Sequence, residues 1–263
     1  MRNNAYDIMD ERLDRYTEYV QFLKSRTDRE QLEKLSSLRG FTPELIDKHD
    51  IFWIGRMQEL LVPDFLDDIQ HFGIISPTNN KPIYHDRWII PIKDTNGKVQ
   101  NLVGYSNVED ERYVYGTGTY YSRKDTLYGL ENYDLAYELG WCIVTEGITD
   151  TLSIRQLGYP NTFSMCGTMR SEKKMEMLNR LRHGVIFIPD RDKAGDNTRN
   201  HWKVNRYFKI HTPIKYKDAD ETLNEKEYDT KEWFKECMDI AIDWIKSDEH
   251  NGRQCPYREE TML

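Results

Sequence analysis

The sequence has few cysteines, no surplus of basic residues and no long apolar run, and each absence excludes a class of protein. No two of its four cysteines stand at the short spacing of a zinc knuckle or ribbon; they are Cys142, Cys166, Cys237 and Cys255. No apolar stretch approaches the length of a membrane span, and no charged start precedes an apolar run as in a signal peptide. We therefore expect a cytoplasmic protein with reduced thiols, no structural zinc site and no membrane partner.

The charge balance is acidic, with 37 Lys and Arg against 45 Asp and Glu in 263 residues. A net charge of -8 repels nucleic acid at long range, so any surface that binds nucleic acid must be local. The excess suits a site built from carboxylates around divalent cations, although an ordinary solvated surface accounts for most of it. With 38% hydrophobic and 12% aromatic residues, the chain can form one large domain or two small ones.

The N-terminal third has a helical pattern and is followed by a β-hairpin. Apolar residues recur at helical spacing between Tyr6 and Arg39, and Thr42-Pro43-Glu44 is a typical helix start, so we expect the first 75 residues to form small packed helices. The character changes at Arg87, where Trp88 to Ile92, a turn at Asn96-Gly97 and Val99 to Tyr105 indicate a hairpin.

From Trp141 onward, predicted strands alternate with predicted helices. The strands are Trp141–Thr145, Thr162–Met165, Val185–Ile188 and a short one near Pro213–Tyr216; the helices are Ile148–Leu157, Ser171–Arg182 and about Ala194–Phe208, with a closing helix at Thr230–Ile245. This alternation predicts an α/β fold, α+β overall, with a parallel sheet flanked by helices.

Acidic residues follow these strands. Glu146 comes directly after one strand, and Asp190 and Asp192 come after another. Because ligands of open α/β sheets bind at the carboxyl ends of the strands, these acids should converge on one crevice. Asp150 lies one helical turn after Glu146, and Asp218 and Asp220 follow the next predicted strand. Hard cations such as Mg²⁺ take such oxygen ligands.

Taken singly, each acid could equally be a helix cap or a solvated loop residue. Asp150 could serve as a favourable charge at a helix N-terminus, and a cap is the favoured role for Asp196. The joint spacing favours a site: Glu146-Gly147-x-x-Asp150 after one strand, Asp190-x-Asp192-x-Ala194-Gly195 after a second, and Asp218-x-Asp220 after a third.

That combination resembles the TOPRIM domain, which DnaG-type primases, topoisomerases and several small nucleases share. The surrounding landmarks resemble the catalytic core of DnaG-type primases. They are Leu38 to Glu44, Arg87 to Ile92 with Asp94, Gly97 and Gly104, Leu127-Tyr128-Gly129-Leu130, Ser164 to Thr168 and Asp218 to Glu221. The resemblance implies a helical lead-in over 1–80, a basic, β-rich subdomain over 81–140, a TOPRIM domain over 141–222 and a C-terminal helix and tail over 223–263.

By the same resemblance, the chain is a DNA primase core that makes short RNA primers by two-metal-ion nucleotidyl transfer. The resemblance assigns catalysis to Glu146, Asp190 and Asp192. It assigns Mg²⁺ or Mn²⁺ to these acids with Asp150, Asp218 and Asp220. In such cores the basic subdomain forms a shallow groove with the TOPRIM sheet, so Arg87, Arg123 and Lys124 are the candidates for binding nucleotide phosphates or template.

The implied partners are single-stranded DNA and nucleoside triphosphates. The family usually carries a zinc-binding module and a helicase-binding or helicase region, and neither is legible in this sequence. We therefore expect a phage-like primase that takes these functions from a replicative helicase and a separate zinc-binding, template-recognition module.

Two other functions stay open at this point. A TOPRIM nuclease acting on structured RNA or DNA would use the same acids to activate water, but it has little need of the segment from Arg87 to Leu130. A non-catalytic replisome subunit could bind single-stranded DNA through aromatic platforms, although such residues more often pack in a core; the candidates are Trp88, Tyr105, Tyr113 and Tyr115. A topoisomerase would need more chain for its gate domains.

Overall fold

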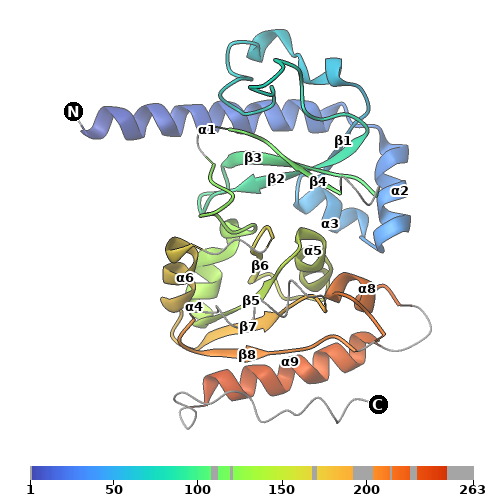
Figure 1. The fold of residues 1–263 in the computed structure, drawn as a ribbon, viewed down its shortest axis with the longest axis vertical. Coiled ribbons are helices and arrows are strands. Elements are labelled where there is room, and N and C mark those ends of the chain that lie inside the picture. Colours follow the sequence, from blue (N-terminus) through green and yellow to red (C-terminus); the bar gives the residue numbers. More distant parts are fainter. Residues whose placement is uncertain are drawn as a thin grey trace. The chain divides into compact units, whose positions relative to one another are not determined.

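The computed structural model describes residues 2–107, 112–118, 121–167, 171–191, 204–213, 215–225 and 230–247, with side chains from residue 8 onward. The chain divides into two compact units, Met1–Ser122 and Arg123–Leu263. Figure 1 shows the elements of both. None of the described helices combines the length and the hydrophobicity that a membrane span requires.

The first unit packs helices against an antiparallel sheet. Its helices are α1 (Arg2–Ser25), α2 (Arg29–Arg39) and α3 (Pro43–Lys48), with 3₁₀ turns η1 (Met57–Leu60) and η2 (Pro63–Phe65). Thr42 caps α3 by accepting from the backbone N–H of Leu45, and Pro43 opens that helix, as its sequence predicts. The strands β1 (Phe52–Ile54), β2 (Arg87–Lys93), β3 (Val99–Tyr105) and β4 (Tyr113–Tyr115) form the sheet in that order.

The two faces of this sheet are covered by different helices. On one face, Tyr16, Tyr19 and Val20 of α1 share a core with Phe52 and Ile89. On the other face, one aromatic residue from each strand forms a continuous row, Trp53, Trp88, Tyr105 and Tyr113, with successive ring centroids 5.1, 5.9 and 5.4 Å apart.

Helix α2 contacts this aromatic row. The indole N–H of Trp88 donates to the carbonyl of Gln31 at 2.7 Å, and Nε of Arg39 donates to the hydroxyl of Tyr105 at 2.6 Å. Trp88 is 8% exposed and Tyr105 is fully buried. These two rings are therefore packing residues and have no face open for stacking a base.

The second unit is built on a parallel sheet with strand order β6-β5-β7-β8. The strands are β5 (Trp141–Thr145), β6 (Thr162–Ser164), β7 (Gly184–Ile188) and β8 (Tyr207–Lys209). The helices are η4 (Leu130–Asn132), α4 (Tyr133–Leu139), α5 (Ile148–Gln156), α6 (Glu172–Asn179), α8 (Ala219–Leu223) and α9 (Thr230–Lys246). The predicted α/β fold with a parallel sheet is confirmed.

Helices lie on both faces of the parallel sheet, as predicted. Cys142 and Val144 of β5 pack with Met175 and Leu178 of α6 on one face. Ile143 of the same strand faces the other way and shares a core with residues of α5, α8 and α9. Both central strands are buried along their whole length, which is typical of parallel sheets. Figure 1 shows α9 lying along the β8 side of the sheet.

Two predictions of secondary structure are wrong. Strand β1 lies within the stretch that was expected to be helical, because its three residues pair with Arg87–Ile89 of β2 and bury Phe52 and Ile54. The fourth parallel strand is Tyr207–Lys209, paired with Val185–Phe187, and not a strand near Pro213–Tyr216. Most of the expected helix Ala194–Phe208 falls outside the described residues, as does Asp196.

Candidate active site

Glu146 and Asp190 lie at the carboxyl ends of the two central strands. Thr145, the last residue of β5, pairs with Ile188, the last residue of β7. Glu146 follows directly and is 7% exposed, whereas Asp190 follows after Pro189 and is half-buried. The structure therefore brings these two predicted acids to one edge of the sheet, as the strand pattern indicates.

Arg191 brings the loop that carries Asp218 to the same edge. Its backbone N–H donates to the carbonyl of Lys217 at 2.7 Å, and its guanidinium donates to the carbonyl of Thr212. Asp218 is the cap of α8, accepting from the backbone N–H of Glu221 at 2.8 Å. Arg191 was not singled out from the sequence, since nothing in the linear pattern shows which loop its side chain would reach.

Asp150 and Asp220 join helix α5 to helix α8. The backbone N–H of Asp220 donates to Oδ1 of Asp150 at 2.8 Å, and the two residues are 4% and 1% exposed. A Cβ on Gly147 would stand 2.4 Å from Oδ2 of Asp150. Gly147 has an ordinary φ of -97°, so space for this carboxylate, and not backbone strain, is what requires glycine.

The carboxylate of Asp220 is held by two further side chains. Its Oδ1 accepts from the hydroxyl of Ser153 at 2.5 Å and from Nδ2 of Asn224 at 2.9 Å. Asp220 is thus engaged in a buried hydrogen-bond network, which gives it a local structural role. Its predicted role as a metal ligand stays a prediction.

The acids of this edge repel one another. Burial raises the pKa of Asp150 well above its usual value, and the charges of Asp218, Asp190 and Asp220 raise it further. A carboxylate in this setting is stabilised by a nearby cation, which favours its ionised form. The electrostatics of the edge therefore suit a divalent cation.

The oxygen donors of the edge fit a hard cation such as Mg²⁺ in their chemistry. Among the described residues, no three His, Cys, Asp or Glu side chains gather in an arrangement that could hold a metal ion. Asp192, the third acid assigned to catalysis, lies outside the described residues. The complete ligand set stays a prediction.

The three predicted phosphate-binding bases differ in their surroundings. Arg123 and Lys124 are exposed in a turn of the second unit, and Nε of Arg123 donates to the carbonyl of Cys166 at 2.8 Å. Arg87 belongs to β2 of the first unit and is only 5% exposed, with its Cδ close to Gly104. Its side chain contributes to the packing of that sheet, and phosphate binding by Arg87 stays a prediction.

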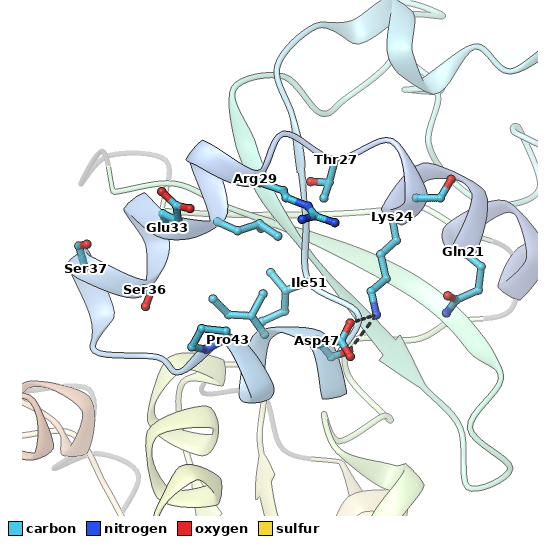
Figure 2. A pocket seen from close by; sticks show the side chains of 13 residues that line it. Gln21, Lys24, Thr27, Arg29, Glu33, Ser36, Ser37, Pro43, Asp47 and Ile51 are labelled. Atoms are coloured by element: carbon cyan, nitrogen blue, oxygen red, sulfur yellow. Dashed lines mark hydrogen bonds and ion pairs between the residues drawn. The ribbon is translucent and has the colours of Figure 1, made fainter.

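The first unit also contains a cavity of about 810 Å³ between the end of α1, α2 and α3. Figure 2 shows Lys24 reaching Asp47 across it, with Nζ 2.8 Å from the carboxylate. Lys24 is also 2.8 Å from Asp50, so its charge is balanced within the wall. Because its lining residues contain none of the acids of the sheet edge, we treat it as separate from the candidate active site.

Comparison with known proteins places these features in a family context. The Toprim-like family matches residues 143–223. DNA primase from Thermotoga maritima is 26% identical over 204 residues, which are 72% of this chain and 36% of that protein. DNA primase from Aquifex aeolicus is 29% identical over 204 residues, 73% of this chain and 39% of that protein.

Solved structures extend the similarity to both units. The Aquifex aeolicus primase, with its zinc-binding and RNA polymerase domains, superposes with a TM-score of 0.72 at 23% identity, covering 89% of this chain and 61% of that one. A DnaG primase catalytic domain bound to single-stranded DNA has a TM-score of 0.72 at 18% identity, covering 89% and 82%. This chain has the fold of a DnaG-type primase core.

Its residues 143–223 match the Toprim-like family, and the resemblance of its fold to the DnaG-type catalytic core, expected from the sequence motifs, is confirmed. The chain spans less than half the length of the two DNA primases from Thermotoga maritima and Aquifex aeolicus.

Proposed function

We propose that this chain is the catalytic core of a DNA primase. It would synthesise short RNA primers on a single-stranded DNA template from nucleoside triphosphates. The observation that carries the proposal is that the likeness to primases extends well beyond the Toprim-like segment: 72% of the chain aligns with a primase in sequence and 89% in structure. A nuclease that shared only the Toprim fold would not require that extended likeness.

The acids of the sheet edge suit the chemistry of this reaction. Glu146, Asp190 and Asp218 offer carboxylates at neighbouring chain segments, and Asp192 would complete the set of catalytic acids. A bound Mg²⁺ or Mn²⁺ would lower the pKa of the attacking 3′-hydroxyl and would neutralise charge on the leaving pyrophosphate.

Asp150 and Asp220 would act by holding the edge in shape. Their hydrogen bond fixes the start of α8, and with it the cap residue Asp218, against α5. Pre-organised charges need not rearrange during the reaction, which is how a fixed edge of this kind contributes to rate.

The proposed substrates and partners follow from the same assignment. Arg123 and Lys124 would contact nucleotide phosphates or the template backbone, because both are exposed cations and Arg123 is hydrogen-bonded to the loop whose Gly167 donates to the carbonyl of Glu146. A relative with a zinc-binding domain and another bound to single-stranded DNA support a DNA template and a separate template-recognition module. A replicative helicase is the remaining proposed partner.

One assay separates this function from its main alternative. The protein is incubated with end-labelled single-stranded DNA, labelled ATP, the other three nucleoside triphosphates and Mg²⁺ or Mn²⁺. A primase adds label to new RNA and leaves the DNA intact. Shortened DNA with no new RNA would identify a Toprim nuclease and refute the proposal.

A further inference from the structure

A buried lysine on α6 serves a purpose that packing alone does not explain. Lys174 is fully buried, whereas its neighbour Lys173 is exposed. A lysine is almost never fully buried without partners, because its ammonium loses its hydration. Burial lowers the pKa of Lys174 to about 8. An apolar residue of similar length would avoid this cost.

The partners of Lys174 are backbone carbonyls on two separate segments. Its Nζ donates to the carbonyl of Met165 at 2.7 Å and to the carbonyl of Arg123 at 3.0 Å. Arg123 in turn donates from Nε to the carbonyl of Cys166 at 2.8 Å. Three hydrogen bonds thus join the turn at Arg123 to the loop that follows β6.

That loop is attached directly to Glu146. The backbone N–H of Gly167 and the hydroxyl of Ser164 donate to the carbonyl of Glu146 at 3.1 and 2.9 Å. Cys166 and Gly167 have φ values of 55° and 105°, so the chain reverses there. The reversal allows the N–H of Gly167 to face Glu146 while the carbonyls of Met165 and Cys166 face Lys174 and Arg123.

The guanidinium of Arg123 lies against this reversal. A Cβ on Gly167 would stand 2.7 Å from Nη2 of Arg123, so the glycine leaves room for the cation. Arg123 is therefore connected to Glu146 through a single loop. Lys174 joins that loop to Arg123 through the two hydrogen bonds of its Nζ.

We propose that Lys174 is a positioning residue that holds Arg123 beside Glu146, so that the guanidinium can meet the phosphates of an incoming nucleotide. The inference rests on the proposed primase function for its substrate. Lys174 itself touches neither nucleotide nor metal in this account. It acts by fixing where Arg123 stands.

The test compares steady-state primer synthesis by the full chain carrying K174M, K174Q, R123A or K174M with R123A. Met matches the length of lysine but donates no hydrogen bond, while Gln keeps two N–H donors. We expect K174M to raise the KM for nucleoside triphosphate about tenfold with a smaller change in kcat. The KM of K174Q should lie between those of K174M and the wild type. In the R123A background, K174M should add little, because the residue it positions is gone.

The control is K173M, which removes an exposed lysine from the same helix and should leave KM unchanged. Loss of thermal stability in K174M with an unchanged KM would overturn the inference, as would independent, multiplying effects of K174M and R123A. Failure of the wild type to make primers would instead refute the proposed function. Crystal structures of the wild type and K174M then test the positioning alone. Arg123 should be displaced in the variant, and an unmoved Arg123 would show that Lys174 does not position it.

Discussion

The backbone N–H of Asp220 donates to Oδ1 of Asp150 at 2.8 Å, and this bond couples two helices whose N-termini meet at the acidic edge. Asp150 is buried beside the charges of Asp218, Asp190 and Asp220, and its pKa is raised by burial first and by these charges second. Without a cation, repulsion between these carboxylates therefore lowers the stability of the folded protein, which chemical denaturation can measure.

We predict that Asp150→Asn stabilises the metal-free protein at neutral pH. Because the pKa of Asp150 is raised, the folded state binds more protons than the unfolded state at pH values between the usual carboxyl pKa and the raised one. The stability of the wild type therefore falls as the pH rises from the usual carboxyl pKa toward the raised pKa. The amide removes the titration and can still accept from Asp220. We expect a gain on the order of 1 kcal/mol in chemical denaturation at pH 7 and a smaller stabilisation by Mg²⁺ than in the wild type.

The matched control for this prediction is Glu176→Gln, an exposed acid on α6. It should change neither the metal-free stability nor the response to Mg²⁺. A metal-free D150N protein that is less stable than the wild type at pH 7 would show that the repulsion is not what governs this position.

Lys174 should make stability increase with pH in the alkaline range. With a folded-state pKa of about 8 against a usual 10.5, the unfolded chain binds the extra proton between these values, so unfolding becomes harder as pH rises. The wild type should gain on the order of 2–3 kcal/mol relative to K174M across this window. Urea denaturation at several pH values measures it.

The charges that act on Lys174 are those of Cys166, Arg123 and Asp125, and the thiol of Cys166 has the largest effect of the three. The comparison is therefore repeated with Cys166→Ser in both proteins. A pH-independent difference between the wild type and K174M would mean that the lysine does not lose its proton in this range.

Gly147→Ala is expected to reduce activity while preserving the fold. The added Cβ would stand 2.4 Å from Oδ2 of Asp150 and would push that carboxylate away from Asp220. Because φ of -97° is open to alanine, the loss should fall on primer synthesis, by about 100-fold, more than on stability. In an Asp150→Ala background the clash disappears, so adding G147A should cost little more; a full further loss would contradict this explanation.

Arg155 is predicted to stabilise the fold of the second unit without taking part in the reaction. Its guanidinium lies 2.6 Å from Glu131 and donates to the carbonyls of Thr162 and Gly129, both at 3.0 Å. Arg155→Met leaves Glu131 and these carbonyls without their partner and should cost about 3–5 kcal/mol in urea denaturation. Arg180→Met, at an exposed position, should cost under about 0.5 kcal/mol. Unchanged kcat for R155M below its melting temperature distinguishes this structural role from a catalytic one.

The central strands could be predicted from the sequence because each is a continuous apolar run in an alternating pattern. Trp141–Thr145 was predicted with the bounds that the structure shows, and Val185–Ile188 with one residue fewer. Strands β1 and β8 could not be predicted, since each is defined by the neighbour with which it pairs. Tertiary pairing, and not local preference, determines such short strands.

The position of the site followed from topology, whereas the connections within it did not. Glu146 and Asp190 had to converge once their strands were parallel neighbours. The bond from Asp220 to Asp150 and the burial of Lys174 depend on how α8 and α6 pack, which the linear pattern does not contain. A lysine beside Met175 in a helix gives no sign in the sequence that its amine is buried.

The most direct test of the account measures formation of the first RNA phosphodiester bond on single-stranded DNA with Mg²⁺. It compares the wild type with Glu146→Gln, Asp190→Asn and Glu176→Gln. We predict labelled RNA from the wild type and E176Q, and a loss of at least about 100-fold in E146Q and D190N, with circular dichroism spectra unchanged. Near-normal RNA synthesis by a folded E146Q or D190N protein would contradict it.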